Sequence, residues 1–132
     1  MEKKQIPDGE LDVMLAVWRV ESPNGASVGE IYENWNNDGE NRTKATLHTL
    51  LDRLCERGFL RFERESDSPT ARKLYYPLVS EKEYRIEASK GFVQRICRGS
   101  WKNLVASLID SKDISDEELR ELAEMLRDRN GK

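Results

Sequence analysis

Apolar residues in the N-terminal half of the chain recur at helical spacing in three successive segments. Each segment places its apolar side chains at i, i+3, i+4 and i+7, which is one face of an amphipathic helix. Turn-forming residues separate the segments at 22–25 and 36–39. The pattern therefore predicts three short helices around a small core. The core residues that it predicts are Leu11, Met14, Leu15, Trp18, Val28, Ile31, Trp35, Leu47, Leu50, Leu51 and Leu54.

Residues at the ends of these segments support the helical interpretation. Asp8 stands where the first helix would begin, and Ser27 with Glu30 has the spacing of a capping box for the second. Thr43 or Asn41 can cap the third, and Gly58 stands where a helix would end in a left-handed conformation.

The period of the pattern changes from 3.6 to 2 after the third helix. Residues 59–65 alternate between apolar and charged, residues 66–71 are polar, and residues 72–77 form a second extended run. This is the pattern of a β-hairpin. Three helices followed by one hairpin predict a winged helix-turn-helix domain over residues 1–79, with the hairpin as its wing.

The remaining residues, 80–132, predict three further helices. Ser80 with Glu83 and Ser115 with Glu118 have capping-box spacing, and Gly99-Ser100 interrupts the apolar pattern between them. Isolated helices of this length are marginal in water, so their apolar faces need a partner surface. A second copy of the segment in a two-fold dimer is one partner, and the N-terminal domain is the alternative. The expected dimerisation residues are Phe92, Ile96, Trp101, Leu104, Val105, Leu108, Leu119, Leu122 and Leu126. The fold class is thus mainly α (α+β), a winged helix domain with a C-terminal helical dimerisation region.

The third helix carries a second stripe made of polar residues. Arg42, Thr46, Thr49 and Arg53 fall at i, i+4, i+7 and i+11. A helix that buries one side and offers Arg and Thr on the other suits the major groove of DNA. An ordinary solvated helix face would look similar. On the DNA hypothesis this stripe faces the groove, His48 lies beside it near the DNA, and the hairpin cations Arg61, Arg64, Arg72 and Lys73 contact the phosphate backbone.

Charge is unevenly distributed along the chain. The net charge is −3 overall, with −6 over residues 1–41, +3 over residues 42–73 and zero beyond. The basic stretch coincides with the third helix and the hairpin, and local charge is what meets phosphate. The hairpin also contains Glu63, Glu65 and Asp67, so a solvated hairpin of mixed charge is the alternative interpretation.

Several classes of chemistry have no residues to support them. One histidine and two distant cysteines cannot build a zinc site in one chain, and no glycine-rich phosphate loop or nucleophile motif is present. We therefore expect no enzyme activity, no metal and no cofactor.

The sequence has no apolar run of about 18 residues, so it predicts no membrane span. It also has no apolar segment near Met1, so it predicts no signal peptide. The two cysteines favour a reduced, cytoplasmic protein.

Several short motifs occur together in a specific order. They are residues 10–14 with Trp18, residues 46–54 followed by Arg57-Gly58, residues 75–77, Gly99-Ser100 and residues 119–122. With these motifs the chain resembles the penicillinase-repressor family, the BlaI/MecI/CopY transcriptional regulators, from about Ile6 to Arg129.

The resemblance implies a homodimeric repressor of transcription that binds double-stranded DNA at an inverted-repeat operator. By position, it places Thr46, Thr49 and Arg53 in the segment that contacts bases, and Arg42, Thr43 and Lys44 near the DNA backbone at the start of that helix. It also implies two modes of regulation. The copper-responsive branch has Cys-x-Cys pairs that this chain lacks. The β-lactam-responsive branch is cut in its helical region by a regulatory protease, and the comparable bond here is Ser100-Trp101. A rival hypothesis is a winged helix module that binds a basic protein through the acidic first 41 residues.

Overall fold

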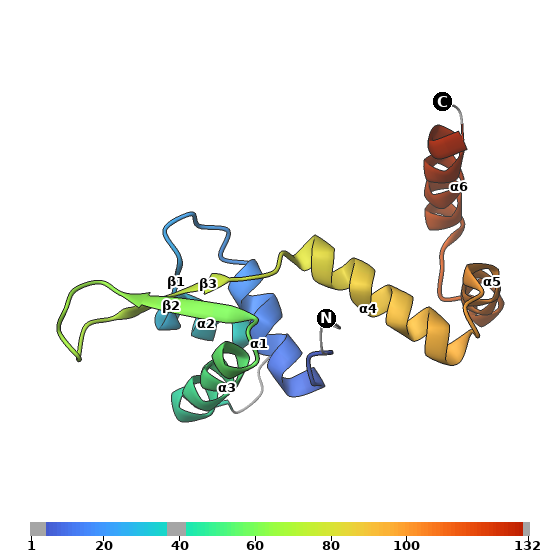
Figure 1. The fold of residues 1–132 in the computed structure, drawn as a ribbon. Helices are drawn as coiled ribbons and strands as arrows, with labels where there is room; N and C mark the ends of the chain where they lie inside the picture. The colour runs from blue at the N-terminus through green and yellow to red at the C-terminus, as the bar shows by residue number, and fades with distance from the viewer. Residues whose placement is uncertain (1–4, 37–41, 131–132) are drawn as a thin grey trace. The chain divides into compact units, whose positions relative to one another are not determined.

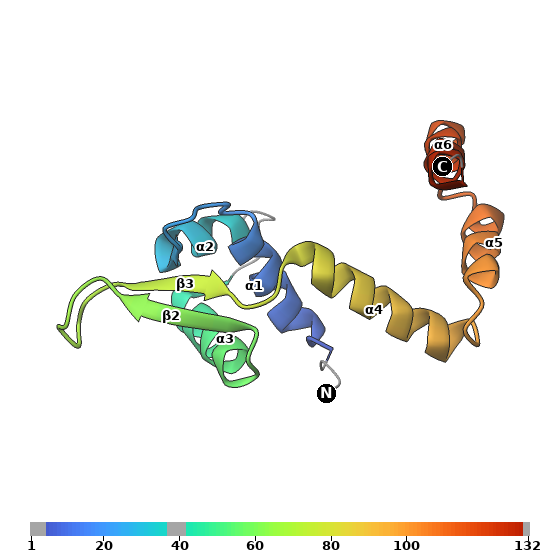
Figure 2. The same cartoon turned by 45° about the horizontal axis from the view of Figure 1, so that its top comes forward.

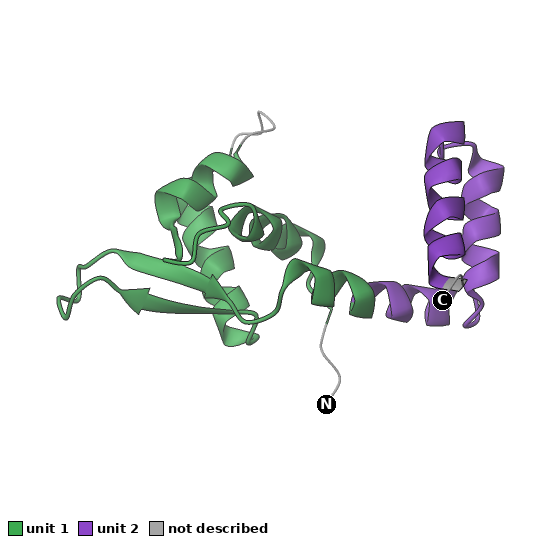
Figure 3. Cartoon of the chain, turned by 90° about the horizontal axis from the view of Figure 1, so that it is seen from above, with its two compact units in different colours: residues 1–87 green, residues 88–132 purple. Residues whose placement is uncertain are grey.

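A computed structural model describes residues 5–36 and 42–130 of the chain. The chain forms two compact units, Met1–Glu87 and Ala88–Lys132, which are described separately below (Figure 3). The elements in chain order (Figure 1) are α1 (Asp8–Trp18), β1 (Ala26–Ser27), α2 (Val28–Trp35), α3 (Lys44–Glu56), β2 (Leu60–Arg64), β3 (Lys73–Pro77), α4 (Glu81–Ile96), α5 (Trp101–Ser111) and α6 (Asp116–Asn130). The predicted mainly α (α+β) winged helix arrangement is confirmed.

The sheet of the first unit has three antiparallel strands in the order β1-β3-β2. β2 and β3 form the predicted hairpin, in which Phe62 pairs with Tyr75. Sequence analysis missed β1, because two residues are too few to show a period. Gly25 precedes β1 with φ of +86°, and a Cβ there would lie 2.8 Å from Cζ of Tyr76. Glycine is therefore required where β1 passes this ring.

The core of the first unit lies between the three helices and the sheet. Of the predicted core residues, Met14, Ile31, Trp35, Leu47, Leu51 and Leu54 are buried. The prediction was wrong for Leu11, Leu15, Trp18, Val28 and Leu50, which are only partly buried, and it missed Val13, Ala16 and Val17. The reason is that α1 contacts α2, α3 and β3. A helix with several neighbours buries more than the single stripe that spacing identifies.

The first turn of α4 packs on the winged helix unit. The hydroxyl of Tyr84 accepts a hydrogen bond from the backbone N–H of Ile6 at 2.7 Å, and the ring of Tyr84 packs edge-on against Phe59. Nearby, Nε1 of Trp18 donates to the carbonyl oxygen of Val79 at 3.0 Å. The predicted capping box of Ser80 and Glu83 is confirmed, so this turn is fixed both at its cap and by its packing.

The second unit consists of the rest of α4 together with α5 and α6. Ser100 caps α5, and Ser115 with Glu118 forms the predicted capping box of α6. Leu104 and Leu119 are partly buried. The other predicted dimerisation residues, Phe92, Ile96, Trp101, Val105, Leu108, Leu122 and Leu126, are each at least 42% exposed. One copy of this unit therefore leaves large apolar side chains exposed on all three helices.

None of the helices formed by the described residues is both long and apolar enough to cross a membrane.

Candidate nucleic-acid interface

The helix α3 has a defined start and a defined end. Thr43 is its N-cap, and Oγ1 of Thr43 accepts a hydrogen bond from the backbone N–H of Thr46 at 3.1 Å. Asn41, the alternative cap, lies outside the described residues. At the other end Gly58 has φ of +87°, as the sequence predicted. These two features fix which residues belong to the helix.

The two faces of α3 differ as the sequence predicted. Leu47, Leu51 and Leu54 are fully buried on one side. Thr46, Thr49, Arg53 and His48 are all exposed. Thr49 donates its hydroxyl proton to the carbonyl oxygen of Ala45 at 3.2 Å, which leaves its oxygen lone pairs available. Arg53 makes no ion pair within the described part of the chain. The structure thus brings the three predicted base-contacting side chains together on the outer side of α3.

Arg42 is placed differently from the sequence prediction. Because Thr43 is the cap, Arg42 precedes the helix and helical spacing does not apply to it. Nη1 of Arg42 donates to the carbonyl oxygen of Trp35 at 2.6 Å, and the guanidinium lies 4.9 Å from the centre of the Trp35 ring. Nη2 is 3.6 Å from Oδ2 of Asp12, and the side chain is only 17% exposed. Arg42 therefore links α1, the end of α2 and the start of α3.

Tyr32 provides a second tie to the start of α3. Its hydroxyl donates to the carbonyl oxygen of Arg42 at 2.9 Å. Nζ of Lys44 lies 5.5 Å from the centre of the Tyr32 ring, while Lys44 itself stays exposed. The backbone just before α3 is thus held by α2. Sequence spacing gave no sign of this contact, since the two segments belong to different elements.

The exposed charges of α3 nearly cancel. Lys44 and Arg53 are opposed by Asp52 and Glu56, and all four side chains are exposed. A helix with this balance can form specific hydrogen bonds, but it supplies little net attraction to phosphate. Net attraction must come from neighbouring cations.

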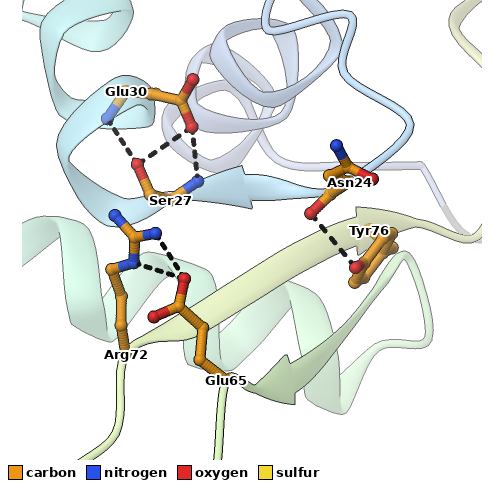
Figure 4. A network of polar contacts seen from close by, with 6 residues as sticks. All are labelled: Asn24, Ser27, Glu30, Glu65, Arg72 and Tyr76. Carbon is orange, nitrogen blue, oxygen red and sulfur yellow. Dashed lines mark hydrogen bonds and ion pairs between the residues drawn. The ribbon is translucent and has the colours of Figure 1, made fainter.

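The wing, defined here as residues 60–77, carries four of the predicted cations. Two of them pair with carboxylates. Nη1 of Arg61 lies 3.4 Å from Oε1 of Glu63. Nε of Arg72 donates to Oε1 of Glu65 at 3.1 Å, and this hydrogen bond raises the pKa of the Arg72 guanidinium. Figure 4 shows the second pair beside the capping box of Ser27.

The other two wing cations have no carboxylate partner among the described residues. Nη1 of Arg64 donates to the carbonyl oxygens of Pro69 and Ala71, at 2.8 and 3.2 Å. Nζ of Lys73 lies 4.4 Å from the centre of the Phe62 ring. The three arginines are exposed and Lys73 is partly buried. Of these four cations, only Arg64 and Lys73 lack a carboxylate partner within the described residues.

A winged helix with a capped third helix is now established, and the family follows from comparison with known proteins. A model of the penicillinase repressor family matches residues 6–128. The chain belongs to the penicillinase repressor family. This confirms the resemblance seen in the sequence. The family is one of regulatory repressors rather than enzymes.

Members of the penicillinase repressor family match nearly the whole chain. The methicillin resistance regulatory protein MecI of Staphylococcus aureus (strain N315) is 29% identical over 125 residues, which cover 92% of this chain and 93% of that protein. MecI of Mammaliicoccus sciuri is 30% identical over 122 residues. The penicillinase repressor of Bacillus licheniformis is 28% identical and covers 94% of this chain and 91% of its own.

The fold is also found among solved structures. The Aeropyrum pernix ORC1 protein, solved in complex with DNA, superimposes with a TM-score of 0.53 at 19% sequence identity. The match covers 69% of this chain and 26% of that protein. At this identity the likeness concerns the fold alone.

Proposed function

We propose that this protein is a sequence-specific DNA-binding repressor that acts as a homodimer on an inverted-repeat operator. The observation that carries the proposal is the outer side of α3, where Thr46, Thr49 and Arg53 are exposed opposite a fully buried leucine face. Thr43 caps this helix, and the contacts of Arg42 and Tyr32 hold its start against α2. Its polar side chains therefore project from a rigid element. A relative named as a penicillinase repressor and one named as a methicillin resistance regulatory protein match over almost the whole chain.

The mechanism is steric repression. Two copies of α3 enter successive major grooves about one helical turn apart, so the operator is a pseudo-palindrome. Thr46, Thr49 and Arg53 hydrogen-bond to base edges, where loss of one good contact costs roughly 1–3 kcal/mol of discrimination. Thr43, Lys44, His48 and the wing lie against the phosphate backbone. Bound dimer excludes the transcription machinery from the site.

The second unit supplies the dimer. Its three helices expose large apolar side chains, which a second copy of the same segment would cover. In a dimer, binding of one winged helix unit to its half of the operator raises the effective concentration of the other unit at the second half. Loss of the dimer should therefore abolish operator binding without unfolding the winged helix unit. Sedimentation of the protein and of a Leu108→Asp, Leu122→Asp variant would measure this. A monomeric native protein would contradict it.

Relief of repression by proteolysis is the regulatory part of the proposal. The candidate bond joins Ser100 to Trp101, where the chain leaves α4 and enters α5. Arg98 and Gly99 both have positive φ there, and the Trp101 side chain is half exposed. A cut at this bond would divide the proposed dimerisation region. Mass spectrometry that recovers an intact 98–104 segment from induced cells would contradict it.

The deciding experiment is selection of bound sequences from random duplex DNA with purified protein at about physiological salt. Recovery of an inverted repeat would support both the base contacts and the dimer. An Arg53→Ala variant should then lose affinity for the selected sequence far more than for mixed-sequence DNA. If folded, dimeric protein recovers no motif, the proposal fails, and a winged helix module that binds a basic protein through the acidic N-terminal residues becomes the better hypothesis.

A further inference from the structure

The wing has two faces that differ in charge. Because side chains alternate along a strand, the register of β2 with β3 assigns each residue to a face. The helix-side face carries Phe62, Arg64, Lys73 and Tyr75. The outer face carries Arg61, Glu63, Glu65, Arg72 and Tyr76.

The helix-side face adjoins α3. Tyr75 is 1% exposed, and its ring centre is 6.0 Å from that of Phe62. Burial, with smaller contributions from the nearby Cys55 and Asp52 of α3, raises the pKa of Tyr75 to about 12. Lys73 also lies close enough to Cys55 for its charge to oppose the rise in the thiol pKa. Figure 2 shows α3 running beside the hairpin. The surface of α3 therefore continues onto this face of the wing.

The outer face is electrically balanced. Arg61 pairs with Glu63 and stacks 4.2 Å from the centre of the Tyr76 ring, and Arg72 pairs with Glu65. Its two cations are thus matched by two carboxylates. Each carboxylate offsets the positive charge that its guanidinium partner offers to phosphate.

The helix-side face has two positive charges and no carboxylate of its own. Arg64 is held by two loop carbonyls, and Lys73 rests on the Phe62 ring. Asp52 of α3, whose charge acts on the neighbouring Tyr75, forms no ion pair with either of them in the described part of the chain. A cation that has no carboxylate partner can neutralise a phosphate and release the counterions that are condensed on DNA.

Phe62 is an exposed aromatic ring between these two cations. Its exposed fraction is 41%, although it lies on the same face as the buried Tyr75. Apolar side chains that contact DNA lie against the sugars or wedge into the minor groove, while flanking cations bind phosphates. The ring and its two cations have the chemistry to contact one stretch of sugar-phosphate backbone.

We propose that the wing binds duplex DNA only through its helix-side face, with Phe62 against deoxyribose and Arg64 and Lys73 on the flanking phosphates. This inference rests on the proposed function, and it narrows the four wing cations to two. It also adds Phe62, which sequence analysis assigned to neither the core nor the site.

The test compares Lys73→Gln with Arg61→Gln in the full-length protein. Both variants lower the net charge by the same amount, and the two residues lie on opposite faces of the same hairpin. Each is titrated with mixed-sequence duplex DNA over a range of salt concentrations. Lys73→Gln should lower the slope of log affinity against log salt by about 0.9, the value for one lost phosphate contact. Arg61→Gln should leave the slope unchanged.

A second pair of variants tests the aromatic contact. Phe62→Ala should weaken binding about fivefold at every salt concentration, as expected for one partly exposed apolar contact, and Phe62→Leu should weaken it measurably less, because leucine keeps part of the apolar surface. The slope should not change. Leu78→Ala is the control, because Leu78 is 54% exposed and lies just beyond β3. Thermal unfolding of each variant shows whether it is folded, and Phe62→Leu keeps the test informative if the alanine variant is not.

Two results would overturn the inference alone. One is an equal decrease in the salt slope of DNA affinity for Lys73→Gln and Arg61→Gln, while Arg53→Ala still abolishes the preference for a selected operator over mixed-sequence DNA. The other is unchanged affinity in folded Phe62→Leu. Failure of the native protein to bind any duplex at low salt would instead overturn the proposed function, and the inference with it.

Discussion

Nε of Arg57 donates to Oε1 of Glu10 at 2.8 Å, and this contact joins the end of α3 to the first turn of α1. Glu10 is only 4% exposed, whereas the Arg57 side chain remains 36% exposed. A carboxylate in this position needs its partner, because burial of an unpaired charge is costly. The pair fixes the C-terminal end of the helix that carries the proposed base contacts.

Arg57→Ala should therefore lower the free energy of unfolding by about 1–3 kcal/mol, less than for a fully buried pair because the guanidinium is partly solvated. Glu10→Gln with Arg57→Ala should recover part of that loss, since no charge is then left buried. Urea unfolding at fixed protein concentration measures both. Strict additivity of the two substitutions would show that the contact contributes nothing.

The contrast between Glu10 and Thr43 shows what the sequence could predict. Capping residues, terminal glycines and alternating strands act within a few residues, so the start and end of α3 and the hairpin followed from local pattern. Glu10 with Arg57, and Arg42 with Asp12, join segments far apart in the chain, and no period records such pairs. Phe62 is an intermediate case. Alternation gives its face, but only the tertiary fold shows that its side chain stays 41% exposed.

Arg42 and Arg53 should respond oppositely to substitution. Arg42→Ala removes a hydrogen bond, a ring contact and an ion pair, and it should lower stability by about 1–3 kcal/mol. Arg53→Ala should leave stability within about 0.5 kcal/mol of the native value, because the side chain is exposed. Its effect should appear in operator affinity. The pair of measurements is urea unfolding and duplex titration. Native stability in Arg42→Ala together with a shallower salt slope would instead make Arg42 a phosphate contact.

The capping box of α2 should make stability depend on acid pH. The backbone N–H and the hydroxyl of Ser27 both donate hydrogen bonds to Oε1 of Glu30. These hydrogen bonds, the backbone one most of all, lower the pKa of the Glu30 carboxyl. A lowered folded-state pKa means that the stabilisation is present above the unfolded-state value, and is lost as pH falls through the folded-state value.

Glu30→Gln should accordingly lose less stability between neutral and acid pH than the native protein does. Urea midpoints measured over that pH range are the readout. Glu33→Gln is the matched control, because it is an exposed glutamate on the same helix. An identical pH profile for Glu30→Gln and the native protein would contradict the role of the capping box. At neutral pH, Ser27→Ala should cost about 1 kcal/mol.

Tyr75 carries a buried hydroxyl for which the described residues provide no hydrogen-bond partner. Burial raises its pKa from 10.0 to about 12. Between these two values the unfolded chain loses the phenolic proton while the folded chain keeps it. Stability should therefore be complete below about pH 10 and fall as the pH rises toward 12.

Tyr75→Phe should flatten this alkaline loss and leave stability at pH 7 unchanged or higher by up to about 1 kcal/mol, since it removes an unpaired buried polar group. Tyr76→Phe should act in the opposite direction, because the Tyr76 hydroxyl donates to the carbonyl oxygen of Asn24 at 3.2 Å. The two neighbouring tyrosines on β3 thus form a matched pair in urea unfolding at neutral and alkaline pH. If Tyr75→Phe were the more destabilising of the two, its hydroxyl would have to be hydrogen-bonded in solution, and the wing would pack against α3 through a polar contact rather than an apolar one.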